Sequence, residues 1–223
     1  MMETLKRIGI VPGQSFDAAK VDQKTLFTMR FAVPYALGKL RQTALYGLYH
    51  QNQGNDWVTF TDFGRYGNDW LRRAVVANEF PGANVAREIL YPFTVVDADG
   101  NPLTGEKRYI LHFDAGQTPP VELLWSLSLY GEDHYLVPNE IKRYAIRSNQ
   151  PLIYNQDGSL DLFIQHERPK EMETNWLPAP RNGFMLMLRL YKPLERALTG
   201  QWKSPPVKAV PAEKTSTGND QKR

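Results

Sequence analysis

The chain has 223 residues, of which 42% are hydrophobic and 12% aromatic, so it can bury one full core and is not disordered as a whole. It contains no cysteine, which excludes disulfide bonds, thiolate metal ligands and a cysteine nucleophile. The formal net charge of +3 arises within residues 203–223, which hold five basic and two acidic residues, so the remaining chain is neutral. A neutral body argues against nucleic-acid binding, which needs a basic face.

The first part of the chain predicts helices. Asp17 is a candidate N-cap for a helix whose apolar residues recur until Pro34, where the pattern is expected to break. A second helical pattern carries the apolar residues of 37–48. Asp69 is a good cap for a third helix that starts with Trp70. We expect these helices to cover a sheet.

From Tyr91 onward the hydrophobic period changes to two, which is typical of β-strands. The predicted strands are residues 91–96, 107–113, 121–130, 143–146, 160–166 and 184–191. In the strongest of them, alternation places on one face Val121, Leu123, Trp125, Leu127 and Leu129. Turns rich in Gly, Pro, Asn and Asp join the strands. This pattern predicts a mainly β fold, an antiparallel jelly-roll-like β-sandwich with N-terminal α-helices.

Three segments are expected along the chain. Residues 1–62 form an N-terminal helical or linker segment, 63–204 a β-sandwich domain, and 205–223 a Pro-rich, basic tail without periodicity that is expected to be disordered. The first residues lack the apolar run of a signal peptide, and no stretch has the length of a membrane span. The chain as written is therefore expected to be soluble and cytoplasmic.

Several motifs together resemble one bacterial family. They are FGRYGNDWLRRA (63–74), DADGNPLTGEKRYILHF (97–113), PPVELLWSLSLYGEDHYLVPN (119–139), RYAI (143–146), DGSLDLFIQ (157–165) and NWLPAPRNGFMLMLRLYKP (175–193). In this order they are similar to domain of unknown function 1214, over about residues 63–207. The front piece IGIVPGQSFD resembles the linker that follows a larger partner, domain of unknown function 1254.

The resemblance implies a jelly-roll-like sandwich without a firmly assigned reaction. Members of the family are commonly exported, periplasmic or envelope-associated, which differs from the location expected of this chain as written. The resemblance also implies a partner domain, domain of unknown function 1254, which this sequence does not contain. A site shared between the two domains would then be incomplete here.

Two strand positions are candidates for acid–base or anion chemistry. His112 is a polar residue of a predicted strand and would serve as a base or ligand near neutral pH, or else as a surface histidine. Arg189 lies in the middle of the last strand and needs a partner if its face is covered, for which Asp161 is the strand carboxylate we nominate. The pair would be architectural, or Arg189 would clamp a carboxylate or phosphate.

Two dipeptides add candidate ligand contacts. Arg143-Tyr144 and Asn175-Trp176 combine hydrogen-bond donors with flat apolar faces, a combination suited to a sugar or an aromatic acid. Trp176 and Trp125 would equally serve as core residues. We therefore nominate Arg143, Tyr144, Asn175, Trp176 and Arg189 as ligand-binding residues.

No metal site or cofactor is expected. His50, His112, His134 and His166 show no short ligand spacing, and the loop after Asp97 departs from a calcium-loop pattern and predicts a plain turn. There is no P-loop, no dinucleotide fingerprint and no G-x-S-x-G elbow.

Three hypotheses for function follow. The first is an accessory β-sandwich module that binds a small polar or carbohydrate-like ligand or packs on a partner domain. The second is a hydrolase or isomerase that uses His112 with Asp161 or Asp114 and holds an anionic substrate through Arg189. The third is an oligomeric, envelope-associated scaffold, since a domain without its usual neighbour would expose apolar surface.

Overall fold

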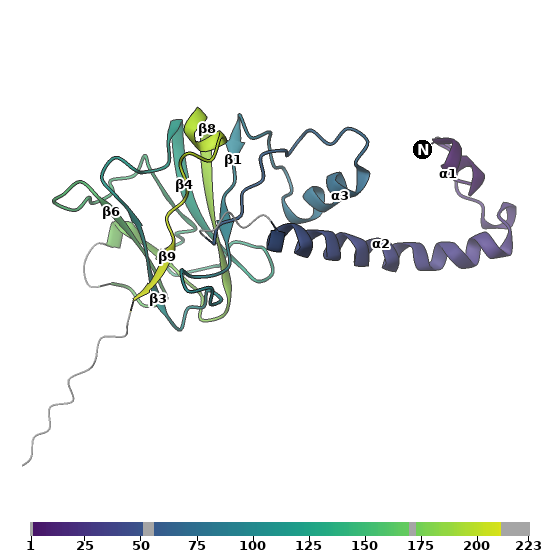
Figure 1. The fold of residues 1–223 in the computed structure, drawn as a ribbon. Coiled ribbons are helices and arrows are strands. Elements are labelled where there is room, and N and C mark those ends of the chain that lie inside the picture. The colour runs from purple at the N-terminus through teal and green to yellow at the C-terminus, as the bar shows by residue number, and fades with distance from the viewer. Residues whose placement is uncertain (1, 51–55, 170–172, 211–223) are drawn as a thin grey trace, which may run out of the picture. The chain divides into compact units, whose positions relative to one another are not determined.

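The computed structural model describes residues 2–50, 56–169 and 173–210. Its internal contacts divide the chain into two units, residues 1–47 and residues 48–223. We call them the helical unit and the sheet unit. Figure 1 shows their elements along the chain.

The helical unit contains α1 (Met2–Arg7), the short 3-10 helix η1 (Ala18–Lys20) and most of α2 (Gln23–His50). Asp17 caps η1 rather than a long helix, because its carboxylate accepts a hydrogen bond of 3.0 Å from Ala19 N. Asp22 does the same for the start of α2, at 2.9 Å from Thr25 N. The predicted break at Pro34 is wrong, since α2 runs through this residue and tolerates the loss of one backbone donor.

The described strands of the sheet unit form two sheets. Sheet 1 has the order β1 (Ile89–Leu90), β8 (Phe184–Pro193), β4 (Val121–Gly131) and β5 (Ala145–Arg147), with β2 (Phe93–Thr94) also paired to β8. Every pairing in this sheet is antiparallel.

Sheet 2 has the order β7 (Trp176–Pro178), β6 (Leu160–Gln165), β3 (Arg108–Phe113) and β9 (Val207–Val210). The pair β6–β7 is parallel, whereas β3 is antiparallel to both of its neighbours. The chain is therefore mainly β, as predicted, with one exception to the antiparallel rule. The jelly-roll topology stays a prediction.

The two sheets pack face to face (Figure 1) because alternate residues of their strands are apolar. The shared core takes Tyr109, Leu111 and Phe113 from β3 and the even-numbered residues 184–190 from β8. Leu123, predicted to share one strand face with Trp125, Leu127 and Leu129, does not join them in this core. An irregularity in the β4–β8 pairing between Val121 and Leu124 shifts the alternation, and Leu123 is 68% exposed.

The outer face of sheet 1 carries a second apolar layer. It contains α3 (Trp70–Glu79), which begins at the predicted cap, with Asp69 Oδ1 accepting from Arg72 N at 2.9 Å. A cluster of aromatic rings holds this layer on the sheet, and neighbouring ring centres lie 5.1 to 6.1 Å apart. The rings are those of Phe60, Phe63, Phe80 and Phe93. Of α3, Val76 is the residue that is buried in this layer, with Phe93 and Met187 of sheet 1.

The prediction of a disordered tail over residues 205–223 is wrong for residues 207–210. Residues 207–210 form β9 and pair with β3, because their backbone completes the edge of sheet 2. A short helix, α4 (Glu195–Leu198), lies between β8 and this strand. The rest of the predicted tail, residues 211–223, lies outside the described residues. Within the described part of the chain, none of the helices combines the length and hydropathy that a membrane crossing requires.

Candidate functional site

Arg189 lies in the middle of β8 on the outer face of sheet 1. Its Nη1 donates a hydrogen bond of 2.9 Å to Ser128 Oγ, and its Nη2 donates to the Tyr130 hydroxyl. The guanidinium carbon also lies 5.4 Å from the centre of the Tyr130 ring. The nominated pair with Asp161 is wrong. Asp161 lies on β6, and its side chain is on the outer face of sheet 2, at the opposite side of the sandwich.

A cavity of about 320 Å³ opens beside Arg189, and we call it the Arg189 cavity. Its walls come from the end of α3 and the loop that follows, from β1 and the next residues, from β4 with its following loop, and from β8. The lining residues are Glu79, Phe80, Pro81, Gly82, Ala83, Ile89, Tyr91, Tyr130, His134, Met185, Met187, Arg189 and Tyr191. This volume is at the low end for ligand pockets, so it suits a small molecule.

The polar side chains in this cavity are mostly hydrogen-bond donors. The Tyr91 hydroxyl accepts bonds from Asn84 N at 3.1 Å and from Asn84 Nδ2 at 3.2 Å, which leaves its own proton to donate elsewhere. The Tyr130 hydroxyl likewise accepts from Arg189. Among the described residues Arg189 makes no ion pair with a carboxylate, so a half-buried cation is balanced by neutral hydroxyls.

His134 and Glu79 make a second polar contact in the cavity lining. His134 Nδ1 lies 3.5 Å from Glu79 Oε2, and this contact ties the loop after β4 to the end of α3. The backbone of His134 has a φ of 64°, a left-handed conformation that few non-glycine residues adopt. The lining therefore contains one carboxylate, that of Glu79, and this carboxylate already contacts the imidazole of His134.

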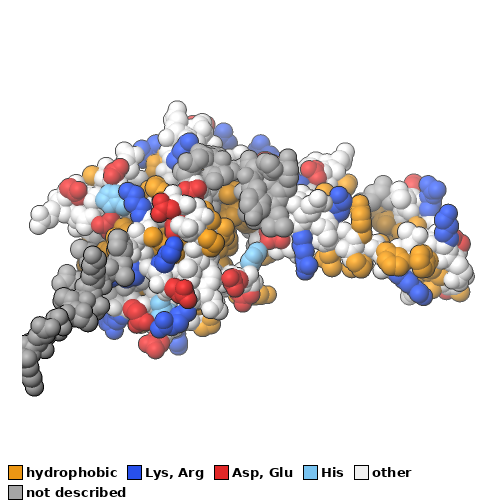
Figure 2. All heavy atoms as spheres, turned by 60° about the horizontal axis from the view of Figure 1, so that its bottom comes forward, with side chains coloured by type: hydrophobic (Ala, Val, Ile, Leu, Met, Phe, Trp, Pro, Cys, Tyr) orange, Lys and Arg blue, Asp and Glu red, His pale blue; other side chains and the backbone are white. Residues whose placement is uncertain are grey.

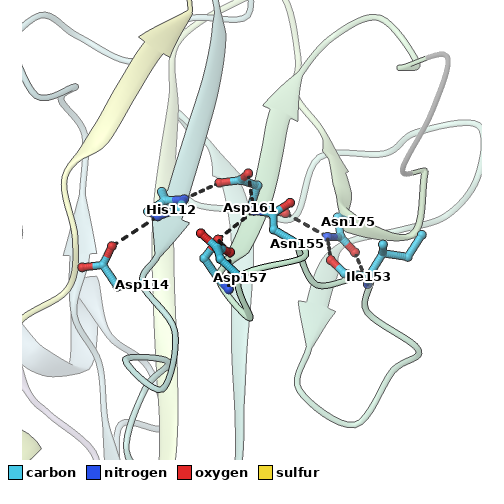
Figure 3. A network of polar contacts seen from close by, with 8 residues as sticks. His112, Asp114, Ile153, Asn155, Asp157, Asp161 and Asn175 are labelled. Atoms are coloured by element: carbon cyan, nitrogen blue, oxygen red, sulfur yellow. Dashed lines mark hydrogen bonds and ion pairs between the residues drawn. The ribbon is translucent and has the colours of Figure 1, made fainter.

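His112 forms a separate polar network on the outer face of sheet 2 (Figure 3). Its Nδ1 lies 2.6 Å from Asp161 Oδ1, and its Nε2 lies 3.3 Å from Asp114 Oδ1. Asp161 Oδ2 also accepts from Asn155 Nδ2 at 2.9 Å. The pairing of His112 with Asp161, proposed for an enzyme, therefore exists in the fold, because the two residues are direct neighbours on β3 and β6.

This arrangement suits a protonated imidazole. A histidine with a carboxylate at each ring nitrogen must donate from both nitrogens, so it holds its proton rather than accepting one. The hydrogen bond to Asp161 raises the pKa of His112 above its ordinary value of 6.5, against a smaller opposing effect of burial, and the charges of Asp161 and Asp114 raise it further. His112 lines none of the three cavities described in this section.

We expect the stability of the protein to depend on the pH through His112. Because its pKa is higher in the folded than in the unfolded chain, the stabilisation is complete below about pH 6.5 and is lost as the pH rises through the folded pKa. Urea unfolding of the wild type and of His112→Gln, between about pH 5 and about pH 9, should show a difference in stability that shrinks with rising pH. An NMR titration that gives His112 a pKa at or below the ordinary value would contradict this.

Three of the nominated ligand residues bind the backbone instead. Arg143 Nη1 donates to Glu173 O and, at 2.9 Å, to Trp176 O, while the Trp176 indole donates to Gln165 O at 2.9 Å. The side chain of Asn175 is fully buried and bonds to backbone groups of Ile153, in the loop before β6, and of Asp161, in β6. Tyr144 is half-buried just before β5 and lines none of the three cavities. Of the five nominated residues, only Arg189 lines a described cavity.

Two further cavities lie between the start of the sheet unit and α4. They have volumes of about 300 and 180 Å³ and share Thr61, Leu198 and Thr199. The larger contains two buried tryptophans, Trp57 and Trp202, whose indole groups already donate to backbone carbonyls. Neither cavity contains any of the nominated residues.

The surface charge of the sheet unit is mixed. On the face that it presents, Figure 2 shows acidic and basic side chains interspersed, without a large area of one sign. Among the described residues, no group of three or more His, Asp or Glu side chains is arranged to hold a metal ion.

The fold and site thus define a β-sandwich with an arginine-containing cavity on one outer face. Residues 88–195 match the model of the family described as "Protein of unknown function (DUF1214)". The chain therefore carries a domain of the DUF1214 family, which confirms the resemblance found in its motifs, over a shorter segment. This segment includes Arg189, Tyr130 and Tyr91 but not Glu79. The partner family 1254 stays a prediction.

Two solved structures match this chain, and the first is similar in fold. The VPA0106 protein from Vibrio parahaemolyticus superposes with a TM-score of 0.63 at 18% sequence identity, covering 94% of this chain and 50% of that chain. A putative uncharacterized protein from Burkholderia cenocepacia gives a TM-score of 0.39 at 16% identity, covering 95% and 50%. The chain thus spans about half the length of these solved proteins. None of the curated proteins matches it.

Proposed function

We propose that the sheet unit is a small-molecule-binding module and that its ligand occupies the Arg189 cavity through an oxyanion. The single observation that carries this proposal is the electrostatic state of Arg189, a half-buried cation with hydroxyl partners in a cavity lined by further donors. Placing a cation in partly buried surroundings without a carboxylate costs free energy, and an anionic ligand would recover it.

The cavity also has the composition of a ligand site. Its walls are largely apolar, from Phe80, Ile89, Met185 and Met187, with a few polar groups that would fix orientation. All of its lining residues lie between Glu79 and Tyr191, within the sheet unit. Most of them fall within the segment that matches the DUF1214 family.

The enzyme hypothesis joined His112, Asp161 and Arg189 in one site, and the geometry does not support that combination. His112 and Asp161 lie on the outer face of sheet 2, whereas Arg189 lies on the outer face of sheet 1, with the shared core between them. An anion held by Arg189 is therefore out of reach of the His112 imidazole. We place the proposal at the Arg189 cavity alone.

A thermal-shift screen tests this proposal. Small oxyanions and neutral molecules are added to the wild type, to Arg189→Met and to Arg147→Met, the last being a control at an exposed arginine of sheet 1 that lines none of the three cavities. A ligand that binds only the folded state raises the melting temperature. We expect at least one oxyanion to stabilise the wild type and Arg147→Met but not Arg189→Met. Equal stabilisation of all three proteins would exclude the Arg189 cavity as the site.

A further inference from the structure

The Arg189 cavity restricts the chemistry of its ligand. We infer, resting on the proposed function, that the ligand is a monocarboxylate with a compact apolar body, of the size of benzoate or phenylacetate. Three features of the lining support this class over phosphates and sugars: the supply of donors, the count of charges, and the apolar walls.

The donors are placed for one oxyanion group. An arginine side chain has five N–H groups, and the two hydrogen bonds to Ser128 and Tyr130 leave three of them for a ligand. The hydroxyl protons of Tyr130 and Tyr91 add two donors, because each of these oxygens is already accepting. A carboxylate has about four lone-pair sites and can satisfy several of these donors at once.

The charges fit a single negative charge. Arg189 is the one arginine or lysine among the described lining residues, and the Glu79 carboxylate in the lining lies against His134 rather than against Arg189. A dianionic phosphate monoester would bring a second negative charge into a cavity that already contains the Glu79 carboxylate. Like charges at close range cost free energy in partly buried surroundings, so the lining disfavours the dianion.

The walls fit an apolar body. Ile89, Phe80, Met185 and Met187 supply no strong hydrogen-bond partner, so the hydroxyl groups of a sugar would be buried against them without partners. An aromatic ring or a branched alkyl group would instead bury apolar surface there. The two methionines can adjust their rotamers to bodies of slightly different shape.

The test compares matched probes on the full chain by isothermal titration and by NMR shift mapping. Benzoate and phenylacetate are the monocarboxylates, benzamide is the neutral analogue, phenyl phosphate is the dianion, and glucose and inorganic phosphate complete the set. We expect a carboxylate to bind about tenfold or more tightly than benzamide and phenyl phosphate, with shifts at Tyr91, Met185 and Met187. Arg189→Met should lose about tenfold to a hundredfold in affinity, while Arg147→Met should bind as the wild type does.

Two variants keep the outcome clear if Arg189→Met folds poorly. Arg189→Lys retains the positive charge but loses the planar guanidinium that can bind a carboxylate through two parallel hydrogen bonds, and Tyr130→Phe removes one donor. Each should weaken carboxylate binding by a smaller factor than Arg189→Met does. Tighter binding of phenyl phosphate, with dependence on Arg189, would overturn the ligand class and leave the proposed function intact. Tighter Arg189-dependent binding of benzamide or glucose, which carry no oxyanion, would overturn both. If no probe shows Arg189-dependent binding, and the thermal-shift screen also finds none, both would be overturned.

Discussion

Asn175→Ala is expected to destabilise the sheet unit by about 3 kcal/mol or more. The Asn175 side chain is fully buried, and Oδ1 accepts from Ile153 N at 2.9 Å while Nδ2 donates to Ile153 O at 2.7 Å and to Asp161 O at 2.9 Å. These bonds join the loop before β6, the strand itself and the segment that leads into β7. Alanine would leave two backbone groups of Ile153 and one of Asp161 without this partner, at about 1 to 3 kcal/mol for each group that water cannot reach.

Urea unfolding measures this loss, and Asn139→Ala provides a matched control. Asn139 also makes three side-chain hydrogen bonds to backbone groups, but it is only half-buried and its partners lie within the same loop. We expect Asn139→Ala to cost about 1 kcal/mol, because water can replace part of what is lost. Equal losses in the two variants would contradict the structural role assigned to Asn175.

Gly105→Ala is expected to cost still more, about 4 kcal/mol or loss of folding. A Cβ atom at this position would lie 1.7 Å from Pro180 O and 2.6 Å from Pro180 C, and backbone atoms cannot move aside as a flexible side chain could. This close approach fixes the turn before β3 against the segment before β8, where Thr104 and Gly183 form an isolated β-bridge. The substitution would have to separate these segments.

Gly100→Ala is the control for this change. Gly100 has a φ of +78°, and an added Cβ would meet no atom within 4 Å, so only the backbone preference is tested. That preference costs about 1 to 2 kcal/mol for a non-glycine residue. Both variants can be followed by urea unfolding with circular dichroism. A cost for Gly105→Ala no greater than that for Gly100→Ala would show that the Pro180 contact is not a constraint.

The long strands could be predicted from the sequence because local alternation determines them. In residues 160–165 and 184–190 every second residue is a large apolar one, and these alternate residues lie in the core as predicted. Helix α3 was predictable from its cap for the same local reason. The alternation failed at Leu123, where an irregularity in strand pairing, invisible in one strand alone, shifted the register.

Short strands and the cavity could not be predicted in this way. The strands β7 and β9 are too short for a period to be recognised, and their place depends on partners far away in the chain. The partner predicted for Arg189, Asp161, was wrong because the sequence of a strand does not indicate which sheet the strand joins. Asp161 and Arg189 both occupy polar positions in apolar strands, but on opposite outer faces.

One signal for the cavity was present in the sequence. Ser126, Ser128 and Tyr130 alternate along β4, opposite the apolar residues of the core, and so define a strand face that carries hydroxyls. Arg189 was the matching polar residue on another strand, and the three hydroxyls were candidate partners for it. The contributions of Glu79 and Phe80 had no such signal, because they come from the end of a helix outside the sheet.

The pairing of β9 with β3 bears on the timing of folding. The last described strand completes an edge next to a strand made much earlier, and Val207 O also accepts from Ala98 N at 2.8 Å. Closing so large a loop carries an entropic cost that local contacts do not offset at once, which slows the formation of such pairs. During synthesis, the outer edge of β3 would stay unpaired until residues 207–210 have left the ribosome.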